Sequence, residues 1–520
     1  MAILAIIVIL AAVGAAVYFS RPQPQPAAGA TGTLTVGSTE FPANGVSPYN
    51  TALDTGFDIE AMIYEGLTSQ DPNGKLLPGL ASSWSANPDY TVWTFRIRNG
   101  VKFHDGTAVN ASAIKSALEV SIKSRLGPLV LGPYVKDMTV LNQSALQFNL
   151  KVPFEAFTYA LSGSPSLIVS PSSYLRNPNQ TGTLVNIGTG PWRQVQWIPN
   201  DRVILEANPD YWNPSRIPKV KTFIWKFFTD SNAMVLSLKS GAIDVAYLQI
   251  PQNQVQTLSQ DPNLRFVRNV YPFTNFLALN VRFKPLDNLY VRKAIAYAID
   301  YDKILRIENA TRAYSVFPPQ IFGQFDAGSQ KNFTYNPTYA RQLMAKAGYP
   351  NGYNGTITLS YPPLQFGPEI SDVVTVVQQN LADIGLKVTL NVIDSATLLA
   401  GATRGQLQMA MFNGGTLTPD PDYMATITYQ IGQLNADIRW GFANQTATSW
   451  VAQARSATSI QDRVAWYHKI QDTFDSQPSH LIFLYNNIHY VFFNKKVQGI
   501  ASMGVSVGYE VDWTQVAVSQ

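Results

Sequence analysis

The chain has 520 residues, of which 46% are hydrophobic and 14% are charged, and its formal net charge is +4. This length allows a large core divided between two or three domains, and the apolar share excludes an intrinsically disordered chain. The absence of cysteine excludes disulfides, thiolate-bound zinc, iron–sulfur clusters and a lipid-modified N-terminal cysteine. The small net charge forms no basic stripe, so we expect no nucleic-acid partner.

Residues 2–19 are an uncharged apolar run. As a helix this run is about 27 Å long, close to the thickness of a bilayer core. We therefore expect residues 1–20 to anchor the chain in the membrane. The alternative is a cleaved secretory signal, although no Lys or Arg precedes the run as in typical signals. Residues 21–31 are predicted to be a Pro/Gln-rich linker, and both readings place the rest of the chain outside the cytoplasm.

Strand and helix patterns alternate along the remaining chain. Apolar residues at helical spacing predict helices over residues 55–67, 290–305, 371–386 and 462–477. Alternating or apolar runs predict strands over residues 32–38, 387–394 and 481–493. Gly385 is expected to end the third of these helices. The alternation predicts α/β domains built as three-layer sandwiches.

The segment WTFRIRNGVKFHDG, residues 93–106, is predicted to be a hairpin. Residues 93–97 alternate as a strand, and Asn99–Gly100 is a strong signal for a two-residue turn. Val101 and Phe103 are then expected to return along the partner strand. Asn110 is expected to cap the helix that follows.

His104 and Asp105 in this segment admit a chemical or a structural reading. No nucleophile motif accompanies them as a triad would require, and His468, His480 and His489 lack metal-ligand spacing. An Asp before Gly commonly makes a turn hydrogen bond. We therefore interpret the pair as structural.

Six blocks follow one another in a fixed order along the chain. They are MIYEGLTSQDPNGKLLPGLASSW (62–84), YTVWTFRIRNGVKFHDGTAVNASAIKSALE (90–119), GTGPWRQVQWIPNDRVILEANPDYW (188–212), LALNVRFKPLDNLYVRKAIAYAIDYDKIL (277–305), YNPTYARQLMAKAGYPNG (335–352) and TPDPDY (418–423). Together they resemble the peptide/nickel-type solute-binding proteins of ABC importers, the family-5 group of oligopeptide- and dipeptide-binding proteins. The resemblance covers roughly residues 32–515.

This resemblance implies a periplasmic-binding-protein-like II fold, a Venus flytrap whose two lobes close on a ligand, with an extra subdomain. The expected ranges are 32–57, 186–272 and 482–520 for lobe I, 58–185 for its subdomain, and 273–481 for lobe II. Two crossing strands, near Tyr271–Phe276 and Leu481–Tyr485, would form the hinge.

The resemblance also implies a function. We expect a monomeric extracytoplasmic protein, without a cofactor, that captures oligopeptides or dipeptides and delivers them to ABC permease subunits. Oligosaccharides are the alternative ligand.

Two other classes of function are less consistent with the sequence. A secreted hydrolase would need paired carboxylates or an activated nucleophile, and neither is evident. A surface structural protein would show repeats. We therefore expect no enzymatic activity.

The ligand contacts are expected in the segment around residues 412–423. Peptide binders of the family often hold the ligand's ammonium with an Asp in this segment, and Asp420 is the best match here, although it could instead cap the helix beginning near Asp422. Asn413 and Gly415 could present amide and backbone groups to a neutral ligand. Aromatic faces for stacking are predicted at Phe412, Tyr423 and Trp440.

Overall fold

The computed structural model describes residues 30–519, except 43–45, 50–53, 125–126, 177–185, 249, 318–332, 368, 416–419, 476, 502–503 and 505–509. The hydrophobic helix predicted over residues 1–20 lies outside this part. No helix among the described residues is long and apolar enough to cross a membrane.

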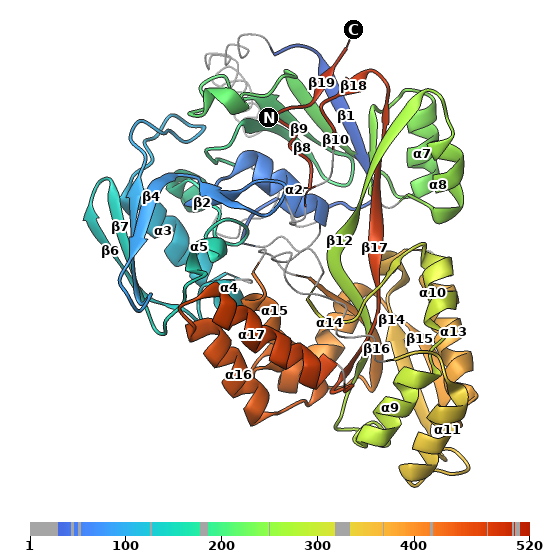
Figure 1. Cartoon of the computed structure of the whole chain (residues 1–520). Helices are drawn as coiled ribbons and strands as arrows, with labels where there is room; N and C mark the ends of the chain where they lie inside the picture. Colours follow the sequence, from blue (N-terminus) through green and yellow to red (C-terminus); the bar gives the residue numbers. More distant parts are fainter. Residues whose placement is uncertain are drawn as a thin grey trace, which may run out of the picture.

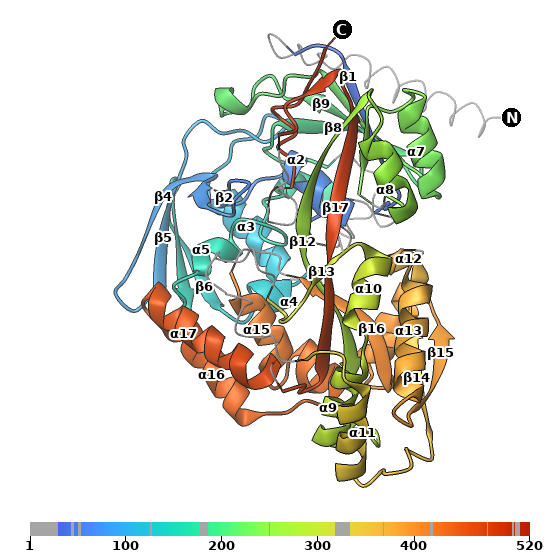
Figure 2. The same cartoon turned by 45° about the vertical axis from the view of Figure 1, so that its right-hand side comes forward.

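One 11-stranded sheet runs through both halves of the molecule (Figure 1). Its path is β15-β14-β16-β12-β17-β11-β1-β10-β9-β8, and β13 pairs with β17. The strands are β1 (Thr33–Ser38), β8 (Trp192–Ile198), β9 (Arg202–Ala207), β10 (Thr222–Phe227), β11 (Val245–Tyr247), β12 (Leu264–Leu279), β13 (Thr311–Arg312), β14 (Thr356–Tyr361), β15 (Lys387–Val392), β16 (Met409–Gly415) and β17 (Leu481–Asn494). The long strands β12 and β17 run antiparallel from the upper lobe into the lower one (Figure 2). The predicted α/β fold with two lobes is confirmed.

Lobe II has three layers because its strands bury both faces. Along β12, Leu277 and Leu279 lie in one apolar core while Phe276 and Ala278 lie in another, as the two-residue period of a strand requires. The first core is covered by α9 (Leu289–Ala298), α10 (Tyr301–Glu308), α11 (Pro337–Lys346) and α13 (Ile370–Ala382). The second is covered by α14 (Ser395–Thr403), α15 (Asp422–Tyr429), α16 (Gln445–Ser456) and α17 (Ile460–Ile470).

The helix predicted over residues 290–305 is in fact two helices, α9 and α10. The Asp300 side chain accepts a hydrogen bond from the Lys303 backbone N–H at 2.9 Å, so this residue caps α10 and ends the continuous helix. The helix predicted over residues 371–386 is confirmed as α13. Gly385 follows it with a φ of +80° and leads into β15, as predicted.

Lobe I packs α2 (Asp54–Ile63), α7 (Ser231–Lys239) and α8 (Gln252–Ser259) around the other half of the sheet. Its core is rich in aromatic rings. Trp225 and Trp513 meet edge to face, with ring centroids 5.6 Å apart, and Trp192 is fully buried in the same cluster. The C-terminal segment is therefore part of this core.

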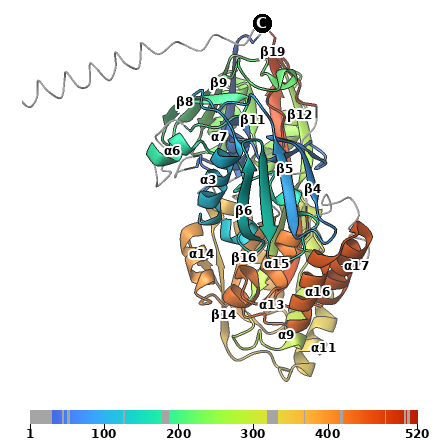
Figure 3. The same cartoon turned by 90° about the vertical axis from the view of Figure 1, so that its left-hand side faces the viewer.

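A subdomain extends lobe I on the side that faces the viewer in Figure 3. It contains the four-stranded sheet β4 (Ala81–Ala86), β5 (Val92–Ile97), β7 (Ala145–Leu150) and β6 (Val135–Asn142), with α3 (Ala111–Ile122) and the short pair β2 (Thr68–Gln70) and β3 (Leu76–Pro78). Asn110 caps α3 as predicted, because its side chain accepts a hydrogen bond from the Ala113 N–H at 2.9 Å.

The predicted hairpin turn at Asn99–Gly100 is wrong. Strand β5 pairs with β4 and β7 and not with residues 101–103, where only Lys102 forms an isolated bridge, to Ala108. A type I′ turn needs positive φ at both central residues, whereas here Gly100 has a positive φ and Asn99 does not. The chain therefore leaves β5 without folding back on it.

His104 joins this segment to the loop at residues 188–190. Its Nδ1 accepts a hydrogen bond from the Gly188 N–H at 3.3 Å, and its Nε2 lies 2.9 Å from the Gly190 carbonyl oxygen. Burial lowers the pKa of His104 to about 4, so the ring is neutral. Asp105 accepts the turn hydrogen bond from the Thr107 N–H at 3.0 Å. The pair is structural, as interpreted.

Candidate functional site

The parallel strands of the two lobes point their carboxyl ends toward each other. β1 is parallel to β10 and β11, and β14 is parallel to β15 and β16. The two groups run in opposite directions, since β11 and β16 are each antiparallel to one of the paired strands β17 and β12. Ligands of open α/β sheets bind outside the carboxyl ends of the strands. The site is therefore expected between the lobes.

A cavity of about 600 Å³ occupies this position, and we call it the interlobe groove. Its walls include Thr39 after β1, Thr229 after β10 and Pro363 after β14. Residues 487–490 of β17 form its side at the hinge. Figure 2 shows α8 above α10 and the short helix α12 (Pro363–Phe366), next to β17.

The interlobe groove is acidic. Its carboxylates are Glu40, Asp230, Glu308, Glu369 and Asp372. No Lys or Arg is among the described residues that line it, and burial lowers the pKa of its one histidine, His489, to about 3. A negative, partly desolvated groove favours a positively charged ligand group.

Glu308 is the carboxylate whose environment differs most from water. Its side chain accepts a hydrogen bond from the Tyr485 hydroxyl at 3.1 Å and is 7% exposed. Burial, against the opposing Tyr485 hydrogen bond and with a contribution from the nearby Glu369 carboxylate, raises the pKa of Glu308 to about 8. At pH 7 this group is mostly protonated, and a cation beside it would favour its ionised form.

Hydrogen bonds cross the groove between the lobes. The Gln252 backbone N–H, at the start of α8, donates to Glu369 Oε1 at 3.4 Å. Asn309, after α10, donates from Nδ2 to Gln252 Oε1 at 3.2 Å and to the Tyr490 hydroxyl at 3.1 Å. Such contacts exist only when the lobes are close together.

The pairing of β12 with β17 breaks at the level of this groove. Val270 is opposite Ile488 and Thr274 is opposite Asn486, so three residues of β12 face one of β17. Asn486 Nδ2 donates to the Phe273 carbonyl oxygen at 2.8 Å and to Thr274 Oγ1 at 2.9 Å, which satisfies the irregular backbone. The hinge was expected at Leu481–Tyr485 on β17, but this segment pairs with β12 inside lobe II. The break in the pairing lies just after it along β17. The residue ranges expected for the lobes stay a prediction.

Three of the predicted ligand residues lie on β16, near the hinge. Asn413 pairs with Asn275 of β12, and its Oδ1 accepts a hydrogen bond from Gln365 Nε2 at 3.1 Å. Gly415 pairs with Phe273, whose ring leaves no room for a side chain there, since an added Cβ would lie 2.2 Å from it. Phe412 is 9% exposed and belongs to the lobe II core.

The two other predicted aromatic residues lie away from the interlobe groove. Trp440 is fully buried, with its ring edge to face against Phe412 at 5.7 Å. Tyr423 packs against the apolar cores of both the subdomain and lobe II. The structure therefore does not bring these two rings together with the groove carboxylates.

Asp420 forms a buried ion pair inside the protein. Arg463 Nη2, on α17, donates to its two carboxylate oxygens at 2.9 and 2.8 Å. Burial raises the pKa of Asp420 to about 6, and the Arg463 guanidinium opposes that rise. Asp420 also caps the next segment, because its Oδ1 accepts a hydrogen bond from the Asp422 N–H at 2.8 Å. Whether it also contacts a ligand stays a prediction.

The model of bacterial extracellular solute-binding proteins, family 5 Middle, matches residues 75–434. The chain belongs to this family of solute-binding proteins. The family-5 resemblance of the sequence is thereby confirmed. As a member, the protein acts outside the cytoplasm, binds a small ligand or peptide and works with the permease subunits of an ABC importer. It is a binding protein and not an enzyme.

Relatives of this family-5 protein differ in their ligands. The glutathione-binding protein GsiB of Pectobacterium atrosepticum is 28% identical over 455 residues, 84% of this chain and 85% of GsiB. DppA from Helicobacter pylori, solved with the peptide STSA, superposes with a TM-score of 0.81 at 24% identity over 94% of this chain and 98% of DppA. AgaA from A.tumefacien R10, solved with agropinic acid, gives a TM-score of 0.82 at 24% identity over 94% and 99%. The structures of DppA and AgaA share the fold of this protein.

The groove carboxylates were not identified from the sequence of this family-5 protein. Glu308 ends α10 and Glu369 precedes α13, and neither stands in a motif. The packing of α10 against α13 brings them to one wall of the groove.

The sequence also did not identify Arg463 as the buried partner of Asp420. A buried arginine on an otherwise apolar helix face would have been the available signal.

Proposed function

We propose that the protein captures a peptide, or a peptide-like solute with a free ammonium group, in the interlobe groove and delivers it to its permease. The observation that carries the proposal is the charge of the groove, with five carboxylates and no Lys or Arg among the described lining residues. A buried ammonium needs a carboxylate partner, because an unpaired buried charge is very costly.

We place the ammonium near Glu308 and Glu369 on the lobe II side. The two carboxylates interact electrostatically, and Glu369 already reaches across the groove to Gln252. A cation between them would favour the ionised form of Glu308 beside Glu369 and would strengthen contacts that exist only in the closed form. This differential stabilisation is what drives closure of a two-lobed binder.

An oligosaccharide is the second candidate. The amide side chains of Asn413 and Gln365 form a neutral pair where β16 ends, and neutral amides suit sugar hydroxyls. In this case, the groove carboxylates would accept hydroxyl hydrogen bonds, and their charge would contribute little to affinity.

We also propose that residues 1–20 anchor the protein in the membrane and that it acts as a monomer. The apolar run of residues 2–19 supports the anchor.

Calorimetry on peptide mixtures tests the ligand class. Short peptides with a free N-terminus should bind, and the same peptides acetylated at the N-terminus should bind at least tenfold more weakly. Glu369→Gln should cost about 2–5 kcal/mol of peptide affinity, as when one partner of a buried charge pair is removed. The control is Glu119→Gln on α3, outside the groove, which should leave affinity unchanged. Equal binding of free and acetylated peptides, or binding of oligosaccharides alone, would contradict the proposal.

A further inference from the structure

Seven Asn-x-Ser/Thr triplets with no proline in the middle position, the acceptor motif for N-glycosylation, occur along the chain. They begin at Asn110, Asn142, Asn179, Asn309, Asn332, Asn354 and Asn444. Asn179 and Asn332 lie outside the described residues. A glycan is bulky and hydrated, and it is attached to surface asparagines of exported chains. The exposure and contacts of the other five asparagines therefore separate well-placed sites from poorly placed ones.

Three of these five asparagines are poorly placed for a glycan. Asn309 Nδ2 donates to Gln252 Oε1 at 3.2 Å and to the Tyr490 hydroxyl at 3.1 Å, so a sugar on this atom would break contacts across the interlobe groove. Asn110 and Asn444 are half-buried, and each caps a helix, α3 or α16, by accepting a backbone hydrogen bond. A sugar on either would have to share the space beside the first helical turn.

Asn142 is exposed, and it is the last residue of β6 before the tight turn into β7. Its Oδ1 accepts a hydrogen bond from the Ser144 N–H at 2.9 Å, and its Nδ2 has no hydrogen-bond partner among the described residues. Because Nδ2 is the atom that carries a sugar, a glycan here breaks no contact within the protein. The neighbouring Leu141 is 49% exposed, and a glycan would shield this apolar side chain from water.

A hollow of about 300 Å³ adjoins Asn142 on the subdomain sheet. Its described lining residues include Ser83, Ser85, Thr94 and Arg96, and no carboxylate is among them. Thr94 and Arg96 alternate along β5 with the buried residues of the subdomain core, so they belong to the outer face of the sheet. Hydroxyl and guanidinium groups form hydrogen bonds with sugar hydroxyls. The first sugars of a glycan on Asn142 thus have a polar surface to lie on.

Asn354 is exposed and lies two residues before β14. Its side chain makes no hydrogen bond among the described residues. The interlobe groove lies beyond the carboxyl end of this strand, at Pro363. The strand has six residues at about 3.3 Å each, so Asn354 is roughly 20 Å from that end. A glycan here would leave the groove and its closure free.

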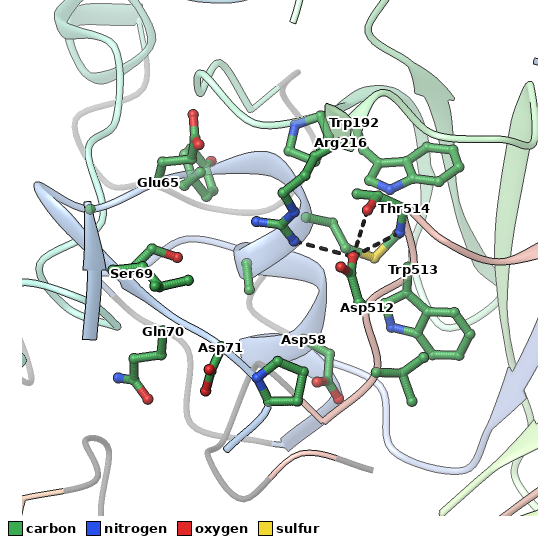
Figure 4. Close-up of a pocket in the computed structure, with 18 of the residues that line it drawn as sticks. Asp58, Glu65, Ser69, Gln70, Asp71, Trp192, Arg216, Asp512, Trp513 and Thr514 are labelled. Carbon is green, nitrogen blue, oxygen red and sulfur yellow. Dashed lines mark hydrogen bonds and ion pairs between the residues drawn. The ribbon is translucent and has the colours of Figure 1, made fainter. Parts of the chain in front are cut away.

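Only 14% of the residues are charged, well below the roughly 25% of a typical soluble domain. Some of these charges also pair within the protein, as Arg216 pairs with Asp512 at 3.2 Å in a lobe I cavity (Figure 4). Surface charge usually keeps a protein soluble, and this chain has little of it. We propose that Asn142 and Asn354 are N-glycosylated and that the glycans supply hydration in place of charge.

Attachment joins the asparagine Nδ2 to the anomeric carbon of a sugar. The bond between that carbon and a phosphate oxygen of a lipid-linked oligosaccharide donor breaks. The phosphate leaves as an anion on the lipid, and the amide nitrogen loses one proton. The protein supplies only the acceptor nitrogen, so no catalytic group is needed beside either asparagine.

Mass spectrometry of proteolytic fragments from the full chain, purified from its native cells, tests the proposal. Fragments that contain Asn142 or Asn354 should carry an oligosaccharide on that asparagine, and the fragment with Asn309 should be unmodified. Asn73 and Asn351 are exposed but begin no triplet, so they are matched controls that should also be unmodified.

Variants produced in the same cells separate the triplet from simple exposure. Ser144→Ala and Thr356→Ala should each remove one glycan from the intact mass, whereas Ser144→Thr and Thr356→Ser keep the motif and should keep the glycan. The two alanine substitutions together should lower the solubility limit about twofold, because both hydrated groups are lost. Equal solubility would overturn the hydration role.

An unmodified Asn142 or Asn354 in the native protein would overturn the proposal. A sugar on Asn309, or a sugar that persists after the alanine substitutions, would overturn it as well. These results do not depend on peptide binding, so they are distinct from a failure of the proposed function.

Discussion

Arg463 holds both carboxylate oxygens of Asp420, at 2.9 and 2.8 Å, in a pair that is almost fully buried. The same guanidinium donates from Nη1 to Glu155 of the subdomain at 3.2 Å. The pair therefore ties the segment after β16 to α17 and to the opposite lobe. These contacts hold Asp420 in place within the protein.

Asp420→Asn should lower the free energy of unfolding by about 3–5 kcal/mol, because the buried Arg463 guanidinium loses the more deeply buried of its two described carboxylate partners and keeps only the half-buried Glu155. Denaturant unfolding measures this. The control is Asp210→Asn, which removes the surface partner of Arg193 and should cost at most about 1 kcal/mol. If stability were unchanged while peptide affinity fell, Asp420 would be a ligand anchor after all.

His104→Asn should lower stability by about 1–2 kcal/mol, since the ring links its turn to Gly188 and Gly190. Ligand affinity should stay within a few fold, because His104 does not line the interlobe groove. Thermal unfolding and calorimetry on the same variant check both values. A hundredfold loss of affinity in a folded variant would show that His104 has a binding role.

Acid should destabilise the protein through three buried histidines. Burial lowers the pKa of His480 and His489 to about 3 and that of His104 to about 4 in the folded chain, whereas unfolded histidines titrate near 6.5. The unfolded chain thus binds more protons below pH 6.5, and each histidine should remove up to about 1.4 kcal/mol of stability per pH unit as the pH falls from 6.5 toward 3. Unfolding measured across this range should show a shallower slope for His480→Gln. An unchanged slope would refute this origin.

If residues 1–20 form an anchor, the native protein should fractionate with membranes and keep its N-terminus. Cell fractionation with N-terminal sequencing tests this. A soluble form that begins near residues 15–20 would show instead that the segment is a cleaved signal.

Local patterns predicted those parts of the fold that depend on a few adjacent residues. Examples are the valines of α13, Gly385 after this helix and the apolar run of β17. The two-lobed arrangement was predicted from the six segments that resemble family-5 proteins. The turn at Asn99–Gly100 was mispredicted because the pairing of β5 with β4 and β7, a long-range choice, overrode the local signal. Glu308 and Glu369 could not be paired from the sequence, since only the packing of α10 on α13 brings them together.

The most direct test of the central claim is the number of protons released when a peptide binds at pH 7. With its pKa raised to about 8, Glu308 is mostly protonated at this pH, and an ammonium beside it should ionise it. Calorimetry in buffers of different ionisation enthalpy should therefore show that protons are released when the peptide binds, and Glu308→Gln should abolish this release. Affinity should rise with pH up to about pH 8. Peptide binding without proton release, or the same release from Glu308→Gln, would contradict the account.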